Sequence, residues 1–289
     1  RILNLKSNPC DSLGIFIKGN DSIIEKNLIK GWDCGLKGNL GFCGYTFGIG
    51  VCGYRNIIKE NTIGNQNYCG IVSCDYFRTV ENSGENLIEN NFIFDVDLVG
   101  IDAFFENSVV AHNYIVNTSQ GIELSSACVK NNTIENNTVI FNKVYGIALA
   151  GLPNKNYFIN NTACYNKGFD ITIVDVAGYQ VFSNNTCDNC VLPGKPECDY
   201  KCPSLEELKS CSEMGGRWCD KLCDDMILSP LSDVKEHLNE VCCKGNCYLP
   251  SHKPSGITIA LSQGWNLISS PLEEPLTLSK IEEFCPLET

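Results

Sequence analysis

The chain has 289 residues, 43% of them hydrophobic, and carries a formal net charge of −12 with a sequence pI of about 4.7. This acidic balance, without any basic stripe, argues against nucleic acid as a partner. No apolar run reaches the roughly 18 residues of a membrane-spanning helix, so we expect no membrane span in this chain.

Seven copies of a short apolar segment with a central asparagine occupy the first 190 residues. The central residues are Asn27, Asn61, Asn91, Asn113, Asn137, Asn161 and Asn185, which differ successively by 34, 30, 22, 24, 24 and 24 positions. A steady period in the low twenties, lengthened twice, predicts a solenoid with two loop insertions. We place the insertions at 30–47 and 72–86, where they either form a binding face or are tolerated surface loops.

Most repeats carry a glycine and an aliphatic residue eight or nine positions after the asparagine, as in Gly100-Ile101 and Gly121-Ile122, with Asp170-Ile171 as a variant. The glycine allows a bend and the aliphatic residue begins a new strand. Short strands separated by bends predict an all-β fold, a parallel β-helix over residues 1–187. We expect it to be right-handed, because parallel crossovers have that hand in nearly all folds.

The residues around each asparagine indicate how a coil is built. The positions three before and two after the asparagine are apolar in almost every repeat and should fill the interior. The residue immediately before it is always polar and should face solvent. We expect the asparagine side chains to bond to backbone groups of neighbouring coils and to form a buried ladder at one bend.

The wording N-x-T-I-x-N followed by G-I-x-L resembles the right-handed parallel β-helix repeat proteins. These include the NosD-like periplasmic proteins and the pectin-lyase-fold group, which binds or cleaves polysaccharides. The resemblance covers residues 1–190 and implies the fold, but it implies no single activity, since the group mixes enzymes, binders and structural proteins. The Asp-pair and Gly-His-Gly motifs of its polygalacturonase-like members are absent, and the scattered histidines and methionines do not support a copper site.

The character of the sequence changes after residue 187, and we expect a small disulfide-rich domain over 188–250. Ten cysteines fall between positions 187 and 247: Cys187, Cys190, Cys198, Cys202, Cys211, Cys219, Cys223, Cys242, Cys243 and Cys247. Such density predicts about five disulfides and an oxidising compartment. Zinc bound by the first four of these cysteines is the less favoured alternative. Capping boxes beginning at Ser204 and Asp233 predict two short helices.

Further disulfides are expected between coils. Cys52 and Cys74 each lie three residues after the aliphatic residue of adjacent coils, where stacked Cα atoms are about 4.8 Å apart, a separation that a disulfide can bridge. Cys34 and Cys69 form a weaker candidate pair. Residues 251–289 begin a β segment whose G-W-N-L-I-S-x-P string resembles a module of exported surface proteins, and we expect that module to be truncated here.

One acidic cluster is a candidate site. Asp102 and Glu123 follow the Gly-Ile pairs of adjacent coils, so in register their carboxylates would lie roughly 5 Å apart, as in a retaining glycosidase. Asp95 and Asp97 lie in the bend before Asp102. Charge repulsion there requires a raised pKa, a bound cation, for which calcium is the candidate, or solvation, and we favour a solvated acidic face.

Two functions remain open. The first is a non-enzymatic, extracellular or cell-surface module, without a required cofactor, that either binds a polysaccharide or other glycan or has a structural role, building an envelope or filament with other envelope proteins. The second is a polysaccharide lyase or glycosidase that uses Asp102 and Glu123 as catalytic residues. It would need a base, for which Lys130 and Lys143 are the nearby candidates, and exposed aromatic residues such as Trp32 or Phe105. Six N-x-S/T sequons also agree with export.

Overall fold

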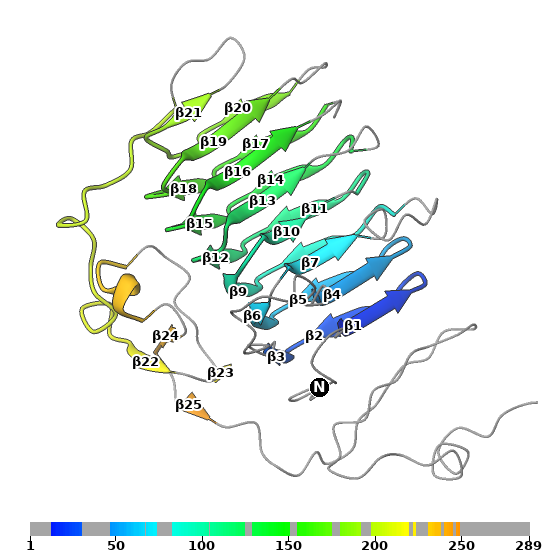
Figure 1. Cartoon of the computed structure of the whole chain (residues 1–289), viewed down its shortest axis with the longest axis horizontal. Coiled ribbons are helices and arrows are strands. Elements are labelled where there is room, and N and C mark those ends of the chain that lie inside the picture. Colours follow the sequence, from blue (N-terminus) through cyan, green and yellow to red (C-terminus); the bar gives the residue numbers. More distant parts are fainter. Residues whose placement is uncertain are drawn as a thin grey trace, which may run out of the picture.

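Three parallel β-sheets surround a common core in the computed structural model of the chain, which confirms the predicted parallel β-helix (Figure 1). The described residues are 13–30, 47–66, 68–73, 83–103, 105–124, 129–150, 155–174, 180–191, 198–219, 222–223, 231–237, 240–244 and 247–248. Most of both predicted insertions, and all of 251–289, lie outside these ranges.

Each coil contributes one strand to each sheet, so neighbours in a sheet come from successive coils. Sheet A consists of β3 (Leu28–Lys30), β6 (Thr62–Gln66), β9 (Phe92–Val96), β12 (Tyr114–Val116), β15 (Thr138–Ile140) and β18 (Thr162–Cys164). Sheet B consists of β1 (Leu13–Lys18), β4 (Phe47–Cys52), β7 (Cys69–Ser73), β10 (Val99–Asp102), β13 (Gln120–Leu124), β16 (Tyr145–Ala150), β19 (Phe169–Val174) and β21 (Cys190–Val191). Sheet C consists of β2 (Ile23–Glu25), β5 (Ile57–Lys59), β8 (Leu87–Glu89), β11 (Val109–Ala111), β14 (Thr133–Glu135), β17 (Tyr157–Ile159) and β20 (Val181–Ser183).

The core is a stack of aliphatic side chains, one from each strand of a coil. In the coil centred on Asn91 these are Ile88, Ile93 and Ile101, all fully buried. They occupy the positions predicted to face inward. Gly100 is required beside them, because a Cβ there would lie 2.6 Å from the carbonyl oxygen of Gly121.

The predicted asparagine ladder is present and buried at the bend between sheets C and A. The side-chain oxygen of Asn137 accepts hydrogen bonds from the backbone N–H and the amide of Asn113, at 2.9 and 3.0 Å. The amide of Asn137 donates to the carbonyl of Val110 and to the side chain of Asn161, at 2.8 and 3.0 Å. The residue before each ladder asparagine has a positive φ, for example 53° at Asn136, which explains why this position is polar and turned outward.

Two further ladders occupy the other bends. The ladder between sheets B and C runs through Ser22, Asn56, Asn86, Ser108, Asn132, Asn156 and Gln180. The ladder between sheets A and B runs through Thr118, Asn142, Asn166 and Asp170. Each bend therefore supplies acceptors for backbone N–H groups that would otherwise be buried without partners.

Carboxylates end two of the three ladders. Asp199 accepts the backbone N–H of Asn185 at 3.1 Å. The two oxygens of Asp170 accept bonds from Asn166 and from the backbone N–H groups of Asp188 and Asn189. This explains why Asp170 replaces the repeat glycine in the last full coil.

The cysteine-rich segment lies against the outer face of sheet A (Figure 1). It contains two antiparallel pairs, β22 (Arg217–Cys219) with β24 (Val241–Cys243) and β23 (Leu222–Cys223) with β25 (Cys247–Tyr248). Its apolar residues, including Leu231 and Val234, join Phe92, Phe94 and Tyr114 of the sheet in one buried cluster. The sheet face that it covers is therefore apolar instead of solvated.

Of the two predicted helices, the first is absent and the second is shorter than expected. At the first, Glu207 accepts the backbone N–H of Ser204 as in a capping box, but residues 205–207 form only a turn. At the second, a three-residue 3-10 helix (Val234–Glu236) follows Asp233. The carboxylate of Asp233 does not cap this helix, because it accepts hydrogen bonds from Cys211 and the Trp218 indole.

No helix among the described residues is long and apolar enough to cross a membrane.

Candidate functional site

Asp102 and Glu123 are brought together as predicted. They are Cα partners in the parallel pair formed by β10 and β13, so there is no slip between the two coils. Ile101 and Ile122, the residues before them, point into the core. Because side chains alternate along a strand, both carboxyl groups face the outer side of sheet B.

The expectation of a solvated pair is wrong for Asp102, which is only 4% exposed, whereas Glu123 is half-buried. The cause is the composition of this outer face. Phe47, Cys69 and Val72 of the preceding coils form a small buried apolar cluster there, with Val99 of the same strand. Asp102 is paired with Val72 on the other side and shares this buried environment.

Burial raises the pKa of Asp102 well above its usual range, and repulsion from Glu123 adds to the shift. Among the described residues, Asp102 Oδ1 has no hydrogen-bond partner. The free thiol of Cys69 lies in the same environment, and burial followed by the field of Asp102 raises its pKa. A carboxyl group with a raised pKa beside a second carboxyl group is the arrangement that glycosidases use for general acid catalysis.

Asp95 and Asp97 lie at the bend between sheets A and B, where a lysine compensates their charge. The Lys143 ammonium is 3.8 Å from Asp97, and Asn117 donates a hydrogen bond to Asp95 at 3.1 Å. Partial burial still leaves the pKa of Asp95 raised, although Lys143 opposes the shift.

The four predicted calcium ligands do not converge. Among the described residues, the side chains that come close enough together to hold a metal ion are those of Cys187, Cys190 and Cys198, and none of the four acids belongs to this group. Calcium binding by Asp95, Asp97, Asp102 and Glu123 stays a prediction.

The groups that a lyase would need are placed elsewhere. Lys130 pairs with Glu106 at 3.0 Å, and Lys143 pairs with Asp97 as above. Phe105 was expected to be an exposed aromatic residue, but it is 1% exposed and belongs to the core. Trp32 lies outside the described residues.

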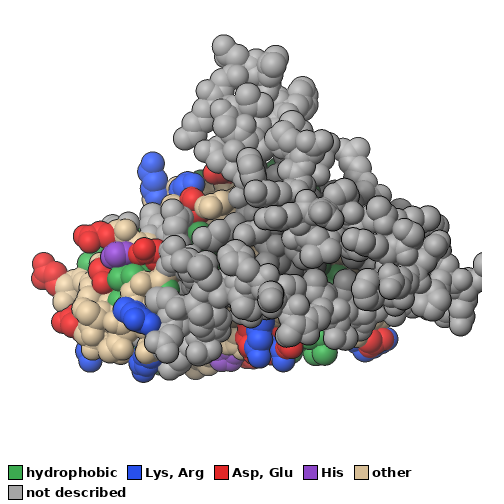
Figure 2. Space-filling view, turned by 90° about the horizontal axis from the view of Figure 1, so that it is seen from below, with side chains coloured by type: hydrophobic (Ala, Val, Ile, Leu, Met, Phe, Trp, Pro, Cys, Tyr) green, Lys and Arg blue, Asp and Glu red, His purple; other side chains and the backbone are tan. Residues whose placement is uncertain are grey.

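The three outer faces of the solenoid differ. Sheet A is covered by the cysteine-rich segment, and the outer face of sheet B carries the buried apolar cluster around Asp102. Sheet C instead presents a row of outward side chains, one per coil, from Ile23 to Val181. Ile23 is 62% exposed, and the other members of the row are half-exposed. In the described part of the surface seen in Figure 2, both acidic and basic side chains are present.

Disulfides hold the cysteine-rich segment, as predicted. Cys187 is bonded to Cys198 and Cys211 to Cys242. Cys219 and Cys243 each take part in a disulfide as well. The side chains of Cys223 and Cys247 lie outside what the structure describes, although their backbones pair in β23 and β25.

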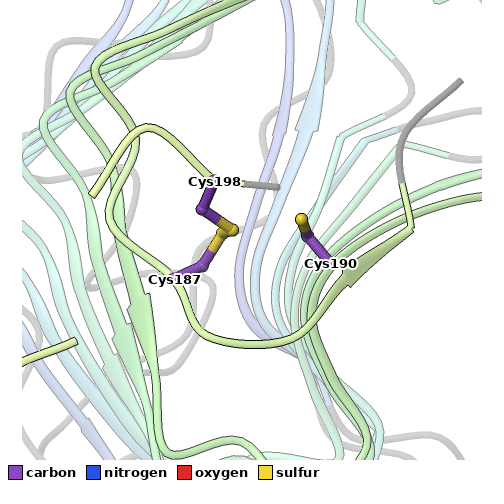
Figure 3. A group of neighbouring side chains, drawn as sticks. All are labelled: Cys187, Cys190 and Cys198. Atoms are coloured by element: carbon purple, nitrogen blue, oxygen red, sulfur yellow. A yellow bond between two sulfur atoms is a disulfide. The ribbon is translucent and has the colours of Figure 1, made fainter. Parts of the chain in front are cut away.

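The predicted alternative of zinc bound by four cysteines is excluded by the pairing. Cys202 is bonded to Cys164 of strand β18, and Cys187 is bonded to Cys198. Cys190, in β21, points toward the latter disulfide (Figure 3), and the three sulfur atoms lie within 4.8 Å of one another. The sequence reasoning missed Cys164, because this residue lies within the repeats, apart from the cysteine-rich stretch.

The expected links between coils are only partly described. Cys52 is disulfide-bonded, while its predicted partner Cys74 lies outside the described residues. The weaker pairing of Cys34 with Cys69 is wrong, because Cys69 is a free thiol. Cys69 packs instead among apolar residues on the outer face of sheet B.

The sequence was also compared with known proteins. Residues 1–163, more than half of the chain, match the family model described as a right handed beta helix region. The chain belongs to this family. As a right-handed β-helix it has the hand expected from the crossover rule. No curated protein and no solved structure matches the chain.

Proposed function

We propose that this right-handed β-helix is a non-enzymatic module of an exported, cell-surface protein, where it binds a glycan. The main support for export is the disulfide between Cys164 and Cys202, which joins the solenoid to the cysteine-rich segment. Two more disulfides lie nearby in the chain, and such bonds persist in oxidising compartments. Partners among other envelope proteins would suit the same rod-like scaffold.

A binding role, as opposed to a catalytic one, is supported by the surroundings of the acid pair. Asp102 is buried, and the lysines considered as bases are engaged with Glu106 and Asp97. The open face of sheet C, by contrast, repeats one set of side chains along the rod, which suits an extended ligand.

The alternative of a polysaccharide lyase or glycosidase is favoured by one observation, the register that places Asp102 beside Glu123. A raised pKa on one member of such a pair is what general acid catalysis requires. The same burial that raises this pKa also limits access to Asp102, so we rank this function second.

A paired assay separates the two functions. The purified protein is incubated with a panel of insoluble and soluble polysaccharides, and both retention of the protein and release of new sugar chain ends are measured. We expect retention without new ends. Release of ends that is lost in Asp102→Asn would instead establish the enzyme, and neither retention nor release from any polymer would contradict both functions.

A further inference from the structure

The outer face of sheet C is divided into two parts of different chemistry. We define the charged half as residues 21–27, 55–61 and 85–91, and the amide half as residues 107–113, 131–137, 155–161 and 180–185. The charged half contains eight acidic or basic residues, namely Asp21, Glu25, Lys26, Arg55, Lys59, Glu60, Glu85 and Glu89. The amide half is longer by one coil and contains two, Glu135 and Lys155.

Charges in the charged half neutralise one another across coils. Arg55 lies 2.7 Å from Asp21 and 4.0 Å from Glu85. Lys26 lies 3.5 Å from Glu60, and a further pair joins Lys59 to Glu25 at 3.3 Å. The charged groups of these exposed ion pairs already interact with one another, so a ligand would have to break the ion pairs to bind them.

Asparagines replace these charges at the bends of the amide half. Asn131, Asn160 and Asn184 are exposed and Asn136 is half-buried, each with a φ between 53° and 58° that turns the side chain outward. Asn136, Asn160 and Asn184 each precede a buried ladder asparagine on successive coils, so their outward amides are displayed at a spacing of about 4.8 Å along the rod. Asn131 lies at the other bend of sheet C, where its amide donates a hydrogen bond to Asn107 at 3.1 Å.

A row of apolar and hydroxyl-bearing side chains runs between these bends. Thr133, Tyr157 and Val181 are Cα partners on successive strands, and all three are half-exposed. Ile159 adds a second half-exposed apolar side chain beside Tyr157. The face therefore combines an aromatic and aliphatic strip with amides on both sides.

These features define the class of ligand. An amide both donates and accepts, as a sugar hydroxyl does, and the flat strip suits the apolar face of a sugar ring. The low density of charge gives no attraction for an ionic ligand, and the net charge of −12 repels polyanions. Because the pattern repeats along the rod, the ligand should be a linear polymer.

We propose that the amide half of sheet C binds an uncharged, linear polysaccharide lying along the solenoid axis. This inference rests on the proposed function and specifies its binding face and ligand class.

Binding is measured by affinity electrophoresis in gels containing soluble neutral β-glucan, xyloglucan or dextran, with polygalacturonate as the anionic comparison. The protein is produced in a host without N-glycosylation, so that Asn131, Asn136, Asn160 and Asn184, which begin sequons, stay unmodified. We expect retardation by at least one neutral polymer and none by polygalacturonate.

Variants locate the binding face. Tyr157→Ser should weaken binding at least tenfold, and Asn160→Asp, which keeps the shape but adds a charge, should weaken it several-fold. The matched control is Ile23→Ser, in the same row but in the charged half, which should bind like the wild type. Both Tyr157 and Ile23 face outward, and an unchanged melting temperature establishes that each variant is folded.

The outcomes distinguish the two claims. Retardation that is equal in all variants would overturn the binding face but leave the proposed function standing. No retardation of the wild type by any polymer would overturn the proposed function, and this inference with it. The same face could instead bind a second copy of the chain, and sedimentation of the same proteins tests this alternative. A wild-type dimer that Tyr157→Ser converts to a monomer would assign the face to self-association and overturn the inference.

Discussion

Each residue of the repeated N-N-T wording has a separate structural task. In the fifth coil, Asn136 adopts the positive φ of the bend, Asn137 joins the buried ladder, and Thr138 begins the next strand with its side chain half-exposed. Asparagine tolerates the first position and satisfies backbone groups at the second. The sequons of the repeats therefore coincide with requirements of the fold.

Replacing a ladder residue should destabilise the protein. Asn137→Leu removes the acceptor for Asn113 and leaves the carbonyl of Val110 without its donor. The free energy of unfolding should fall by about 1–3 kcal/mol, or more if both groups stay dry. Chemical denaturation measures this change. As a control, Asn136→Gly, at the outward position, should change stability by no more than a few tenths of a kcal/mol. Equal effects of the two substitutions would contradict the ladder.

The buried acid Asp102 should make stability depend on pH. Burial raises its pKa in the folded protein well above the ordinary aspartate value of 3.8. The contribution of Asp102 to stability is therefore complete below that ordinary value and is lost as the pH rises through the folded pKa. Asp102→Asn should therefore stabilise the protein at pH 7 by at least ~1 kcal/mol. It should also reduce the loss of stability that the wild type shows as the pH rises. The causes of the raised pKa of Asp102 are burial and repulsion from Glu123, and Glu123 remains in the variant.

Melting temperatures between pH 4 and 8 test this prediction. Glu135→Gln, which removes a half-exposed carboxylate from sheet C, serves as the control and should leave the slope unchanged. A wild-type melting temperature that rises over this range, with the same rise in Asp102→Asn, would show that Asp102 is solvated and ionised.

At the scale of elements, the cysteine-rich segment functions as a cover for sheet A. It is bonded to the last coil through Cys164 and Cys202, and the Tyr165 hydroxyl donates a hydrogen bond to the carbonyl of Pro203. Burial is the main reason that the pKa of Tyr165 rises to about 12. The described part of the segment also packs on sheet A through the apolar cluster with Phe92 and Phe94. The segment is thus both covalently attached to the solenoid and packed against it.

Cutting the attachment should loosen the cover without unfolding the solenoid. The double variant Cys164→Ser, Cys202→Ser opens a loop of 38 residues, which should cost about 3–4 kcal/mol. Hydrogen exchange should then accelerate in residues 205–219 and stay slow at the ladder bends. The control is the double variant Cys187→Ser, Cys198→Ser, which removes a disulfide that closes a loop of 11 residues. Faster exchange throughout sheets B and C in the first variant would contradict a separable cover.

Sequence reasoning succeeded where a feature recurs in every coil. The inward isoleucines and the Asn137 ladder were predicted because their residue types hardly vary. The ladder through Ser108 and Asn132 was missed because serine and glutamine replace asparagine in some coils, although its members always lie five residues before the first ladder. That constant offset is the signal that would have found it.

Burial of the candidate site could not be predicted in the same way. Whether Asp102 is solvated depends on Phe47, Cys69 and Val72, which reach it only through the stacking of coils. Register was predictable from the repeat, but the environment outside the sheet was not. The role of Cys164 was likewise hidden, because its partner lies 38 residues away in another part of the fold.

At the scale of the whole molecule, the three outer faces of the solenoid differ in what covers them and in their charge. Sheet A is covered by the cysteine-rich segment, sheet B carries an acid pair of which Asp102 is buried, and sheet C is open with most of its charges in one half. A non-enzymatic binder should therefore contact its ligand on sheet C, whereas an enzyme acting through Asp102 should contact it on sheet B.

Hydroxyl-radical footprinting of the protein, with and without a bound neutral polysaccharide, tests this account most directly. Mass spectrometry of peptides reports the oxidation of each exposed side chain. We predict that the ligand protects Tyr157 and Ile159 but leaves Ile23 and the peptide around Glu123 unchanged. Protection confined to the peptides containing Asp102 and Glu123, with Tyr157 still oxidised, would contradict a binding face on sheet C and favour the enzyme.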